Sequence, residues 1–440
     1  MAIEAEAIQF GPWTSVNYSV PAIDLGPDVI AEMSNVELDD AGSIKTRKGF
    51  AKYISSALSG TPSITGCGKQ RFTSSSSSVF VIAGTKFYED VDGTWTDRTS
   101  SQTITAGNDN TFILANAGGT LVASNGVDTI KKWAAAAGNI AALGMGSSSV
   151  TRASIIAWWD NRVWLVNTNQ GERRAHYSSS TDIEAYGAND YFQTDGALTG
   201  AGPVKSFFAL HNEDAIYGLF PTGNSSTPYS IQRRADRGTI ARRSVIMDEA
   251  GNQMFMRRDG VYLWDGSNPP VKVSGNFDGI QFWDKVNQDR LEYSFAIENR
   301  AKNQVIFAIP YGTNQTLMNK YVIWNYKRQQ WVGVFDDYTR ICGAYFDGFP
   351  HFGGSGDGLL YKHNTGTNDN STAIKSFAAL AATPPMSIAD VARWLYARHE
   401  FEASETSYEI TVQQRGPSIV SRADGFAVGD PSDAIETEFI

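Results

Sequence analysis

The chain has 440 residues, of which 42% are hydrophobic, 12% aromatic and only 19% charged. This composition suffices for a large core, and it favours strands over helices because Thr, Val and aromatic residues are frequent between glycine-rich turns. The net charge of −10 argues against a protein that grips nucleic acid over its whole surface, although an acidic wall would let DNA slide past without sticking.

Residues 1–34 carry Pro12, Pro21, Gly26 and Pro27 and show little alternation of apolar and polar side chains. We interpret them as an extended N-terminal arm that runs over the surface or onto a neighbour; the alternative is a loosely ordered terminus. The first ten residues contain two Glu and no Lys or Arg, and no run of 18 apolar residues occurs anywhere. The sequence therefore predicts neither a signal peptide nor a membrane span.

Residues 35–50, NVELDDAGSIKTRKGF, predict two short strands joined by a turn, and a repeated pattern follows them. In this pattern a small or polar turn precedes a short strand with an aromatic residue. It ends at Tyr88, Trp133, Trp164, Tyr217, Tyr262, Trp324 and Tyr361. The mean spacing of about 45 residues is the size of one four-stranded blade, so the sequence predicts an all-β fold, a β-propeller. Seven markers indicate seven blades; six or eight remain open, because the Trp133 marker precedes an alanine-rich stretch.

One complete blade is recognisable between residues 293 and 335. Apolar runs at Tyr293–Ile297, Val305–Ile309, Tyr321–Trp324 and Trp331–Phe335 are separated by polar turns. Four such runs in succession predict an antiparallel meander.

The ring of blades must also be closed. Arg393–Glu402 and Ser407–Gln413 are interpreted as late strands and Ile44–Ile54 as an early one, and we predict that the late and early strands share a blade. Deleting residues 407–440 should then abolish soluble folding. A rival interpretation makes Ser387–His399 a helix, with Ser387 as its N-cap.

The end of the chain, residues 416–440, is acidic. After its last basic residue it holds Asp424, Asp430, Asp433, Glu436 and Glu438. We interpret it as a tail that is mobile or docks on a partner, so its removal should leave folding intact and affect assembly. The predicted domains are thus an N-terminal arm (1–34), a propeller (35–415) and an acidic tail (416–440).

Motifs for catalysis and metal binding are missing from the sequence. Gly68–Lys69 lacks the upstream glycine and the Ser/Thr of a P-loop, and the glycines from Gly353 form no nucleophile elbow. Glu89–Trp95 superficially resembles the Asp box of sialidase propellers but does not recur. Most acids precede a turn glycine, as in Asp92, Asp259, Asp265, Asp347 and Asp357. The spacing of the five histidines is unlike a metal site, and we interpret them as solvated loop residues. We expect no enzyme activity, no cofactor and no metal.

Two further residue types need an interpretation. The two cysteines, Cys67 and Cys342, are too few for a disulfide framework and are predicted to be free, buried thiols. The repeated Tyr and Trp residues occupy equivalent positions in each unit, which favours packing between blades over stacking on sugars.

An arginine-rich segment stands out in this acidic chain. It holds Arg233, Arg234, Arg237, Arg242, Arg243, Arg257 and Arg258. Because adjacent residues of a strand point to opposite faces, neither arginine pair can present both side chains to one phosphate track. We interpret the segment as a protein–protein contact, with the acidic tail as one candidate partner; the alternative is a solvated sheet surface.

Three stretches in order resemble the β-propeller tail nozzle, or tail hub, proteins of short-tailed bacteriophages. They are NVELDDAGSIKTRKGF, then HYSSSTDIEAY after an NRVWL strand, and then YVIWNYKRQQWVGVFDD followed by GAYFDGFPHFGGSGDGLLY. The resemblance spans about residues 35–413.

The resemblance implies a structural virion protein. It implies six copies around the tail axis that continue the DNA channel below an adaptor ring and portal, with double-stranded DNA passing through without specific binding. It also implies contacts to tail fibres or spikes, and synthesis in the host cytoplasm before incorporation into the virion.

Two alternatives stay open. A glycan-binding propeller acting as a receptor-recognition module should present Trp or Tyr to solvent at the tops of its blades. A propeller glycoside hydrolase should bring two or more acids together in its central funnel.

Overall fold

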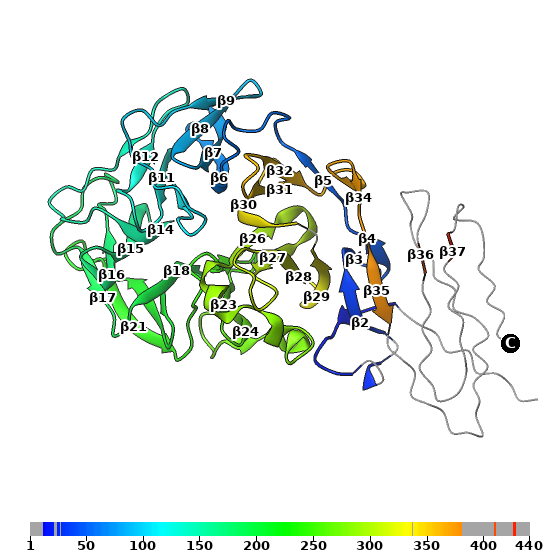
Figure 1. Cartoon of the computed structure of the whole chain (residues 1–440). Coiled ribbons are helices and arrows are strands. Elements are labelled where there is room, and N and C mark those ends of the chain that lie inside the picture. Colours follow the sequence, from blue (N-terminus) through cyan, green and yellow to red (C-terminus); the bar gives the residue numbers. More distant parts are fainter. Residues whose placement is uncertain are drawn as a thin grey trace, which may run out of the picture.

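The computed structural model describes residues 12–21, 24–26, 28–336, 338–380, 409–410 and 426–427. Within them the chain forms seven four-stranded antiparallel units arranged around one centre (Figure 1), which confirms the predicted β-propeller and resolves its blade number as seven. Each blade runs outward from an inner strand, and the inner strands of neighbouring blades contact one another around the ring. No helix in the described part of the chain is long and apolar enough to cross a membrane.

The first five blades follow one another along the chain. Blade 1 contains β6 (Ile64–Arg71), β7 (Ser77–Ala83), β8 (Lys86–Val91) and β9 (Thr94–Asp97). Blade 2 contains β10 (Ile113–Ala117), β11 (Thr120–Ser124), β12 (Lys131–Trp133) and β13 (Ala141–Ala142). Blade 3 contains β14 (Ala153–Trp159), β15 (Arg162–Thr168), β16 (Gly171–Tyr177) and β17 (Tyr191–Gln193). Blade 4 contains β18 (Leu198–Val204), β19 (Phe207–Asn212), β20 (Ile216–Pro221) and β21 (Tyr229–Ala235). Blade 5 contains β22 (Ile246–Met247), β23 (Gln253–Arg257), β24 (Gly260–Trp264) and β25 (Val271–Lys272).

The last two blades are wider than four strands, and each includes strands from the N-terminal part of the chain. Blade 6 contains β26 (Phe295–Asn299), β27 (Gln304–Ile309), β28 (Lys320–Asn325) and β29 (Gln330–Phe335), extended by β3 (Val36–Leu38) and β4 (Ile44–Thr46). Blade 7 contains β30 (Arg340–Phe346), β31 (Phe349–Gly354), β32 (Leu360–His363) and β5 (Phe50–Lys52), followed by β33 (Asn368–Asp369) and β34 (Thr372–Ala373). The four apolar runs predicted for residues 293–335 are confirmed as β26–β29 to within two residues.

Two small sheets and short 3₁₀ turns complete the fold. β1 (Ser15–Val16), β2 (Val29–Ser34) and β35 (Phe377–Leu380) form a sheet whose strands β1 and β2 contact β29 of blade 6. β36 (Glu409–Ile410) pairs with β37 (Phe426–Ala427). The 3₁₀ turns include η2 (Gly275–Phe277), η3 (Trp283–Lys285) and η4 (Gln288–Tyr293) between blades 5 and 6, and η5 (Arg300–Lys302) within blade 6.

The predicted closure was right about the early strand and wrong about its partner. Phe50, Ala51 and Lys52 of β5 pair antiparallel with β32 and supply the outer strand of blade 7. Because β5 leads directly into blade 1, this pairing brings the first and last blades side by side. Of the two late runs, Arg393–Glu402 lies outside the described residues, and Glu409–Ile410 pairs with β37 instead of β5. The rival helix at 387–399 also lies outside them.

The aromatic markers occur once in each blade. Six of them lie on the third strand, namely β8, β12, β20, β24, β28 and β32, whereas Trp164 lies on the second strand of blade 3. Two of the rings pack between blades, as predicted: Trp133 of blade 2 lies 5.1 Å from Phe87 of blade 1, and Trp164 of blade 3 lies 5.1 Å from Phe208 of blade 4, centroid to centroid. The rings of Tyr262, Trp324 and Tyr361 instead pack against rings of their own blades.

The Asp-Gly pairs form turns, as expected from the sequence. Asp92–Gly93 joins β8 to β9 and Asp347–Gly348 joins β30 to β31, with positive φ at all four residues. Two successive positive φ values define the type I′ hairpin, whose twist matches that of the flanking strands.

Candidate arginine interface

The arginine-rich segment runs from β21 of blade 4 to the turn after β23 of blade 5. Because it includes the whole connection between these blades, its seven arginines do not form one patch. They separate into an outer pair on β21, a junction group between blades 4 and 5, and an axial pair at the centre of the ring.

The outer pair is exposed to solvent. Arg233 forms an ion pair of 3.1 Å with Asp236, and Arg234 Nη2 donates to the carbonyl of Gly266 in blade 5 at 3.3 Å. Both side chains reach solvent although they point to opposite faces, because β21 is the outermost strand of blade 4. An exposed ion pair such as that of Arg233 contributes little to stability. Because both guanidinium groups reach solvent, both can contact a partner.

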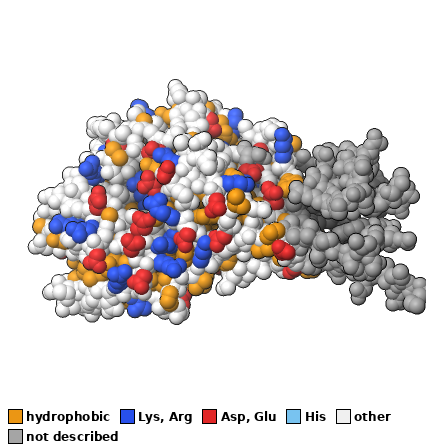
Figure 2. All heavy atoms as spheres, turned by 60° about the horizontal axis from the view of Figure 1, so that its bottom comes forward, with side chains coloured by type: hydrophobic (Ala, Val, Ile, Leu, Met, Phe, Trp, Pro, Cys, Tyr) orange, Lys and Arg blue, Asp and Glu red, His pale blue; other side chains and the backbone are white. Residues whose placement is uncertain are grey.

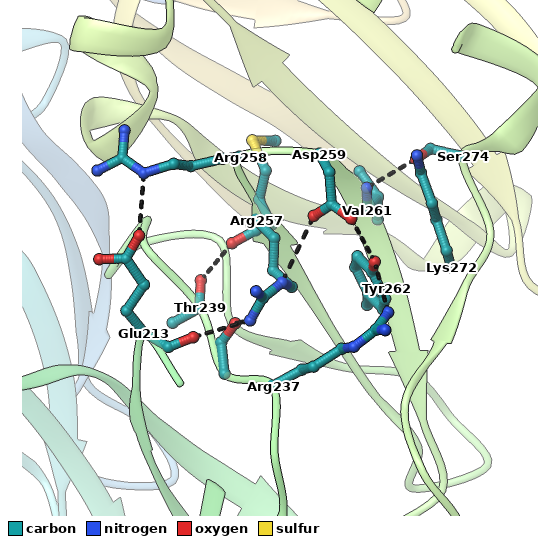
Figure 3. Close-up of polar contacts among 12 residues, drawn as sticks. Glu213, Arg237, Thr239, Arg257, Arg258, Asp259, Val261, Tyr262, Lys272 and Ser274 are labelled. Atoms are coloured by element: carbon teal, nitrogen blue, oxygen red, sulfur yellow. Dashed lines mark hydrogen bonds and ion pairs between the residues drawn. The ribbon is translucent and has the colours of Figure 1, made fainter. Parts of the chain in front are cut away.

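The junction group tightens the contact between blades 4 and 5 (Figure 3). Arg257 Nη1 donates to the carbonyls of Glu213 and Gly238 at 2.8 and 3.0 Å, and Arg258 Nε donates to the Glu213 carboxylate at 2.9 Å. Gly238 lies so close to its neighbours that a Cβ there would be 1.9 Å from the carbonyl oxygen of Asn212. The blade junction therefore depends on backbone contacts that tolerate no side chain.

A second chain of polar contacts crosses the same junction. Arg237 Nη1 donates to the Tyr262 hydroxyl at 3.1 Å, and that hydroxyl donates to Asp259 Oδ2 at 2.6 Å. Burial opposes ionisation of Asp259, but the hydrogen bond from Tyr262 and the nearby Arg257 and Lys272 outweigh it and lower the pKa of Asp259. Arg237 and Arg258 are exposed, so this junction presents two arginines at the surface while its buried part is already paired.

The axial pair, Arg242 and Arg243, points into the centre of the ring. Arg243 Nη1 donates to the carbonyl of Ile341 on β30 at 2.8 Å, and its guanidinium lies 5.1 Å from the ring of Phe295. Arg242 Nη1 lies 3.5 Å from the carbonyl of Ser154 on β14. Because β14 belongs to blade 3 and β30 to blade 7, the two adjacent side chains span the axial opening.

Carbonyl groups and an aromatic ring surround this half-buried positive charge. Neither Arg242 nor Arg243 forms an ion pair with a carboxylate in the described part of the chain. Burial, together with the neighbouring Arg242, lowers the pKa of Arg243 to about 9, so Arg243 remains a cation at neutral pH. Burial also lowers the pKa of Arg242. The sequence shows that this pair is positively charged but not where its side chains point, since side chains in a connection between blades can point outward or toward the axis.

Another arginine that sequence reasoning missed joins connections on opposite sides of the ring. Arg290, on η4 between blades 5 and 6, forms an ion pair with Asp109 in the connection between blades 1 and 2. Its guanidinium also lies 4.0 Å from the ring of Tyr293. Since these connections lie across the ring from each other, the contact crosses the channel.

The acids expected to partner the arginines belong to the C-terminal tail. Asp424, Asp430, Asp433, Glu436 and Glu438 all lie outside the described residues. On the face drawn in Figure 2, Lys and Arg side chains are interspersed with Asp and Glu, so no broad patch of one charge is presented there.

A groove of about 330 Å³ lies between blades 5 and 6. It is lined by Asp248, Glu249, Ala250, Asn252, Leu263, Trp324, Tyr326, Lys327 and Gln329. Burial, with Glu249 and Glu298 nearby, raises the pKa of Tyr326 to about 12. The ring of Trp324 is only 4% exposed, so it does not offer a flat platform to a ligand.

The histidines were wrongly interpreted as solvated. His176, His211, His351 and His363 are all buried, whereas His399 lies outside the described residues. Each buried histidine lies on a strand beside aromatic rings, as His351 does at 3.6 Å from Phe346, because a neutral imidazole packs like another ring. The described residues contain no group of three or more His, Cys, Asp or Glu side chains able to hold a metal ion.

Comparison with known proteins concerns the fold. No protein-family model matches the chain, and no curated protein matches it. Similar solved structures include YCF48 bound to D1 peptide (10% identity, TM-score 0.42, 70% of this chain and 94% of that one). A chain of the Mitotic Checkpoint Complex is also similar (11% identity, TM-score 0.47, 72% and 93% of the two chains). So is the computationally designed Ika8 protein (12% identity, TM-score 0.42, 71% and 99%). By its own strand topology, this chain is a seven-bladed β-propeller.

Proposed function

We propose that the protein is a structural component of the tail of a short-tailed bacteriophage. Copies of the chain form a nozzle ring, six in number, around the DNA-ejection channel, and they anchor tail fibres or spikes. The observation that carries the proposal is a propeller whose centre is filled by its own arginines and whose outer side is widened by strands from distant parts of the chain.

The additional strands give the propeller a side suited to assembly. β3 and β4 extend blade 6 beyond its fourth strand, and β2 pairs with β35, more than 340 residues later in the sequence. These strands are not needed to complete the four-stranded blade, so they enlarge the surface that the ring can offer to neighbours. The stretches that resemble phage nozzle proteins include β3–β4 and β28–β32, which lie on this side.

The filled axis determines where DNA would pass. Arg242, Arg243 and the Arg290–Asp109 contact cross the opening of the propeller, leaving no passage for a duplex within one chain. In this proposal the channel therefore lies between copies. The net charge of −10 and the mixture of both charges on the face drawn in Figure 2 suit a wall that DNA slides past.

A glycoside hydrolase is disfavoured by the composition of the inner strands. The seven strands β6, β10, β14, β18, β22, β26 and β30 contain a single carboxylate, Glu298, and it forms an ion pair of 2.7 Å with Arg300. Glycoside hydrolysis generally needs two carboxylic acids that flank the scissile bond.

A glycan-binding module is the second candidate, and the groove between blades 5 and 6 is the observation in its favour. Sugar-binding surfaces, however, use aromatic faces open to solvent. Within the described residues every Trp and Tyr is buried or half-buried, and Trp324 contributes little exposed surface to the groove.

Native mass spectrometry and sedimentation of the full-length chain test the proposed ring. The wild type is expected to assemble into hexamers. The variant R233E/R234E, which reverses the exposed outer pair, is expected to lose assembly while keeping its melting temperature. R300E is the control, because Arg300 is also exposed but lies in a turn of blade 6. A wild-type chain that stays monomeric at every concentration would contradict the proposal.

A further inference from the structure

The two cysteines meet at the seam where the ring closes. Cys67 lies on β6, the inner strand of blade 1, and Cys342 lies on β30, the inner strand of blade 7. Their Sγ atoms are 3.7 Å apart, although 275 residues separate them in the sequence. Both thiols are free, and they are 1% and 4% exposed, as predicted for buried free cysteines.

No backbone ladder holds this seam together. β6 and β30 belong to different sheets, and the Cys342 thiol donates to the backbone carbonyl of Ile64 on β6 at 3.2 Å. The ring is held closed at its outer edge by the pairing of β5 with β32. At the inner edge the blades meet through Cys67, Cys342, apolar neighbours such as Ile64 and the ion pair of Lys69 with Asp347 at 2.6 Å. A covalent bond at this position would connect the two blades directly.

The sulfur atom of Cys342 occupies space that a glycine leaves open. Cys342 is opposite Gly353 in the β30–β31 pair, where a side chain would meet its Sγ at 2.7 Å. Because Gly353 has no side chain, the sulfur has a place beside the backbone. A disulfide needs an S–S distance of about 2.05 Å, so the two atoms must approach by about 1.7 Å, which side-chain rotation and a small strand shift can supply.

The chemistry at the seam favours slow oxidation. The pKa of Cys67 is raised by the hydrogen bond with Cys342 and by burial, while the nearby guanidinium of Arg243 lowers it. The thiolate is the nucleophile in disulfide exchange, so a raised pKa slows the reaction, and the Arg243 cation stabilises the small fraction that ionises.

We propose that Cys67 and Cys342 are a modification site, oxidised to an intramolecular disulfide that locks the propeller ring. The thiolate of one cysteine attacks a small-molecule disulfide, forms a mixed disulfide and releases one thiol. The second cysteine then attacks the protein sulfur of the mixed disulfide, so that the Cys67–Cys342 bond forms and a second small thiol leaves. Two protons pass to the leaving thiols, and the two electrons reduce the oxidant.

The bond would close a loop of nearly the whole propeller. Such a cross-link removes many conformations of the unfolded chain, and the effect grows with loop length. In the folded state it would also prevent blades 1 and 7 from separating, which is the first step in opening a ring of blades.

The experiment uses the full-length chain incubated with oxidised glutathione or with a reductant. Intact mass measured under denaturing conditions, after alkylation of free thiols, is expected to show loss of two hydrogens and no alkylation in the oxidised sample. Peptide mapping should find Cys67 joined to Cys342, and the melting temperature should rise by roughly 5 °C relative to the reduced chain. The C67S and C342S variants should show no such rise.

The mass and peptide results come from the wild type and so do not depend on how well the serine variants fold. Glutathione adducts on the separate cysteines, disulfide-linked dimers, or two thiols that are alkylated after prolonged oxidation of the folded chain would each overturn the proposal. So would a cross-link that forms only after unfolding in denaturant.

Discussion

His211 shows how this fold uses titratable residues as packing groups. Its side chain is fully buried on β19, its Nε2 lies 2.6 Å from Gln253 Oε1, and its ring packs 5.0 Å from that of Phe255. Burial lowers the pKa of His211 to about 4, although the hydrogen bond with Gln253 acts in the opposite direction. Burial likewise lowers the pKa values of His176 and His351 to about 4.

These histidines predict acid lability. In the unfolded chain these histidines bind protons near pH 6.5, whereas in the folded chain they do so only near pH 4. The folded state is therefore most stable above pH 6.5 and loses stability as the pH falls toward 4. When the pH is lowered from 7 to 4.5, the unfolding free energy should decrease in both proteins, by about 2 kcal/mol less in H211N than in the wild type. Urea titrations at the two pH values measure both decreases. Equal losses in the two proteins would show that His211 does not couple folding to protonation.

Gly238 supplies a test at the blade 4–5 junction. The Cβ of G238A would lie 1.9 Å from the carbonyl oxygen of Asn212 and 2.7 Å from that of Ala215, and neither backbone oxygen can move without displacing a strand end. We expect G238A to lower the unfolding free energy by about 3 kcal/mol or more. G275A is the control, since nothing lies within 4 Å of its Cβ, and it should stay within about 0.5 kcal/mol of the wild type. If both variants melt alike, the close contact at Gly238 is not as described.

At the scale of elements, the sequence predicted what is local. The third strand is covered on both faces over most of its length in blades 4, 5 and 6, and six of the seven aromatic markers lie on third strands. The hairpin at β28–β29 could be predicted because its apolar runs and polar turn are adjacent in the chain. The pairing of β5 with β32, which closes the ring, could not be predicted, because some 300 residues separate the two strands and each could pair equally well with several others.

The prediction of one contact surface from the arginine-rich segment was wrong for a related reason. Sequence distance suggested one patch, but the segment contains the connection between two blades, and such a connection passes close to the axis. Arg242 and Arg243 therefore point inward, while Arg233 and Arg258 reach solvent. The histidines were misjudged because a polar residue near a turn in the sequence gives no sign of the rings that another strand brings to it.

Closure by β5 reverses the expected result of truncation. A chain that lacks residues 407–440 should stay soluble and unfold cooperatively, because every strand of the seven blades lies before residue 374. A chain that lacks residues 1–52 should aggregate, since blade 7 then loses its outer strand and blade 6 its extension. Circular dichroism melts of the two truncated chains decide the matter. If the chain without residues 1–52 melts cooperatively and the chain without residues 407–440 aggregates, the ring is not closed by β5.

At the scale of the whole molecule, the filled axis and the widened side of the ring lead to the same account. A propeller whose centre is crossed by Arg242, Arg243 and Arg290 offers its outer surface for contacts, and β2, β3, β4 and β35 enlarge that surface beside blade 6 (Figure 1). A nozzle built from such subunits needs a channel between copies.

Single-particle imaging of the purified full-length chain tests this account most directly. It predicts a six-fold ring that encloses an opening wide enough for duplex DNA, with density for Arg242 and Arg243 closing the axis of every propeller. Separate propellers without a ring, or a ring whose only opening runs along the axis of a propeller, would contradict it.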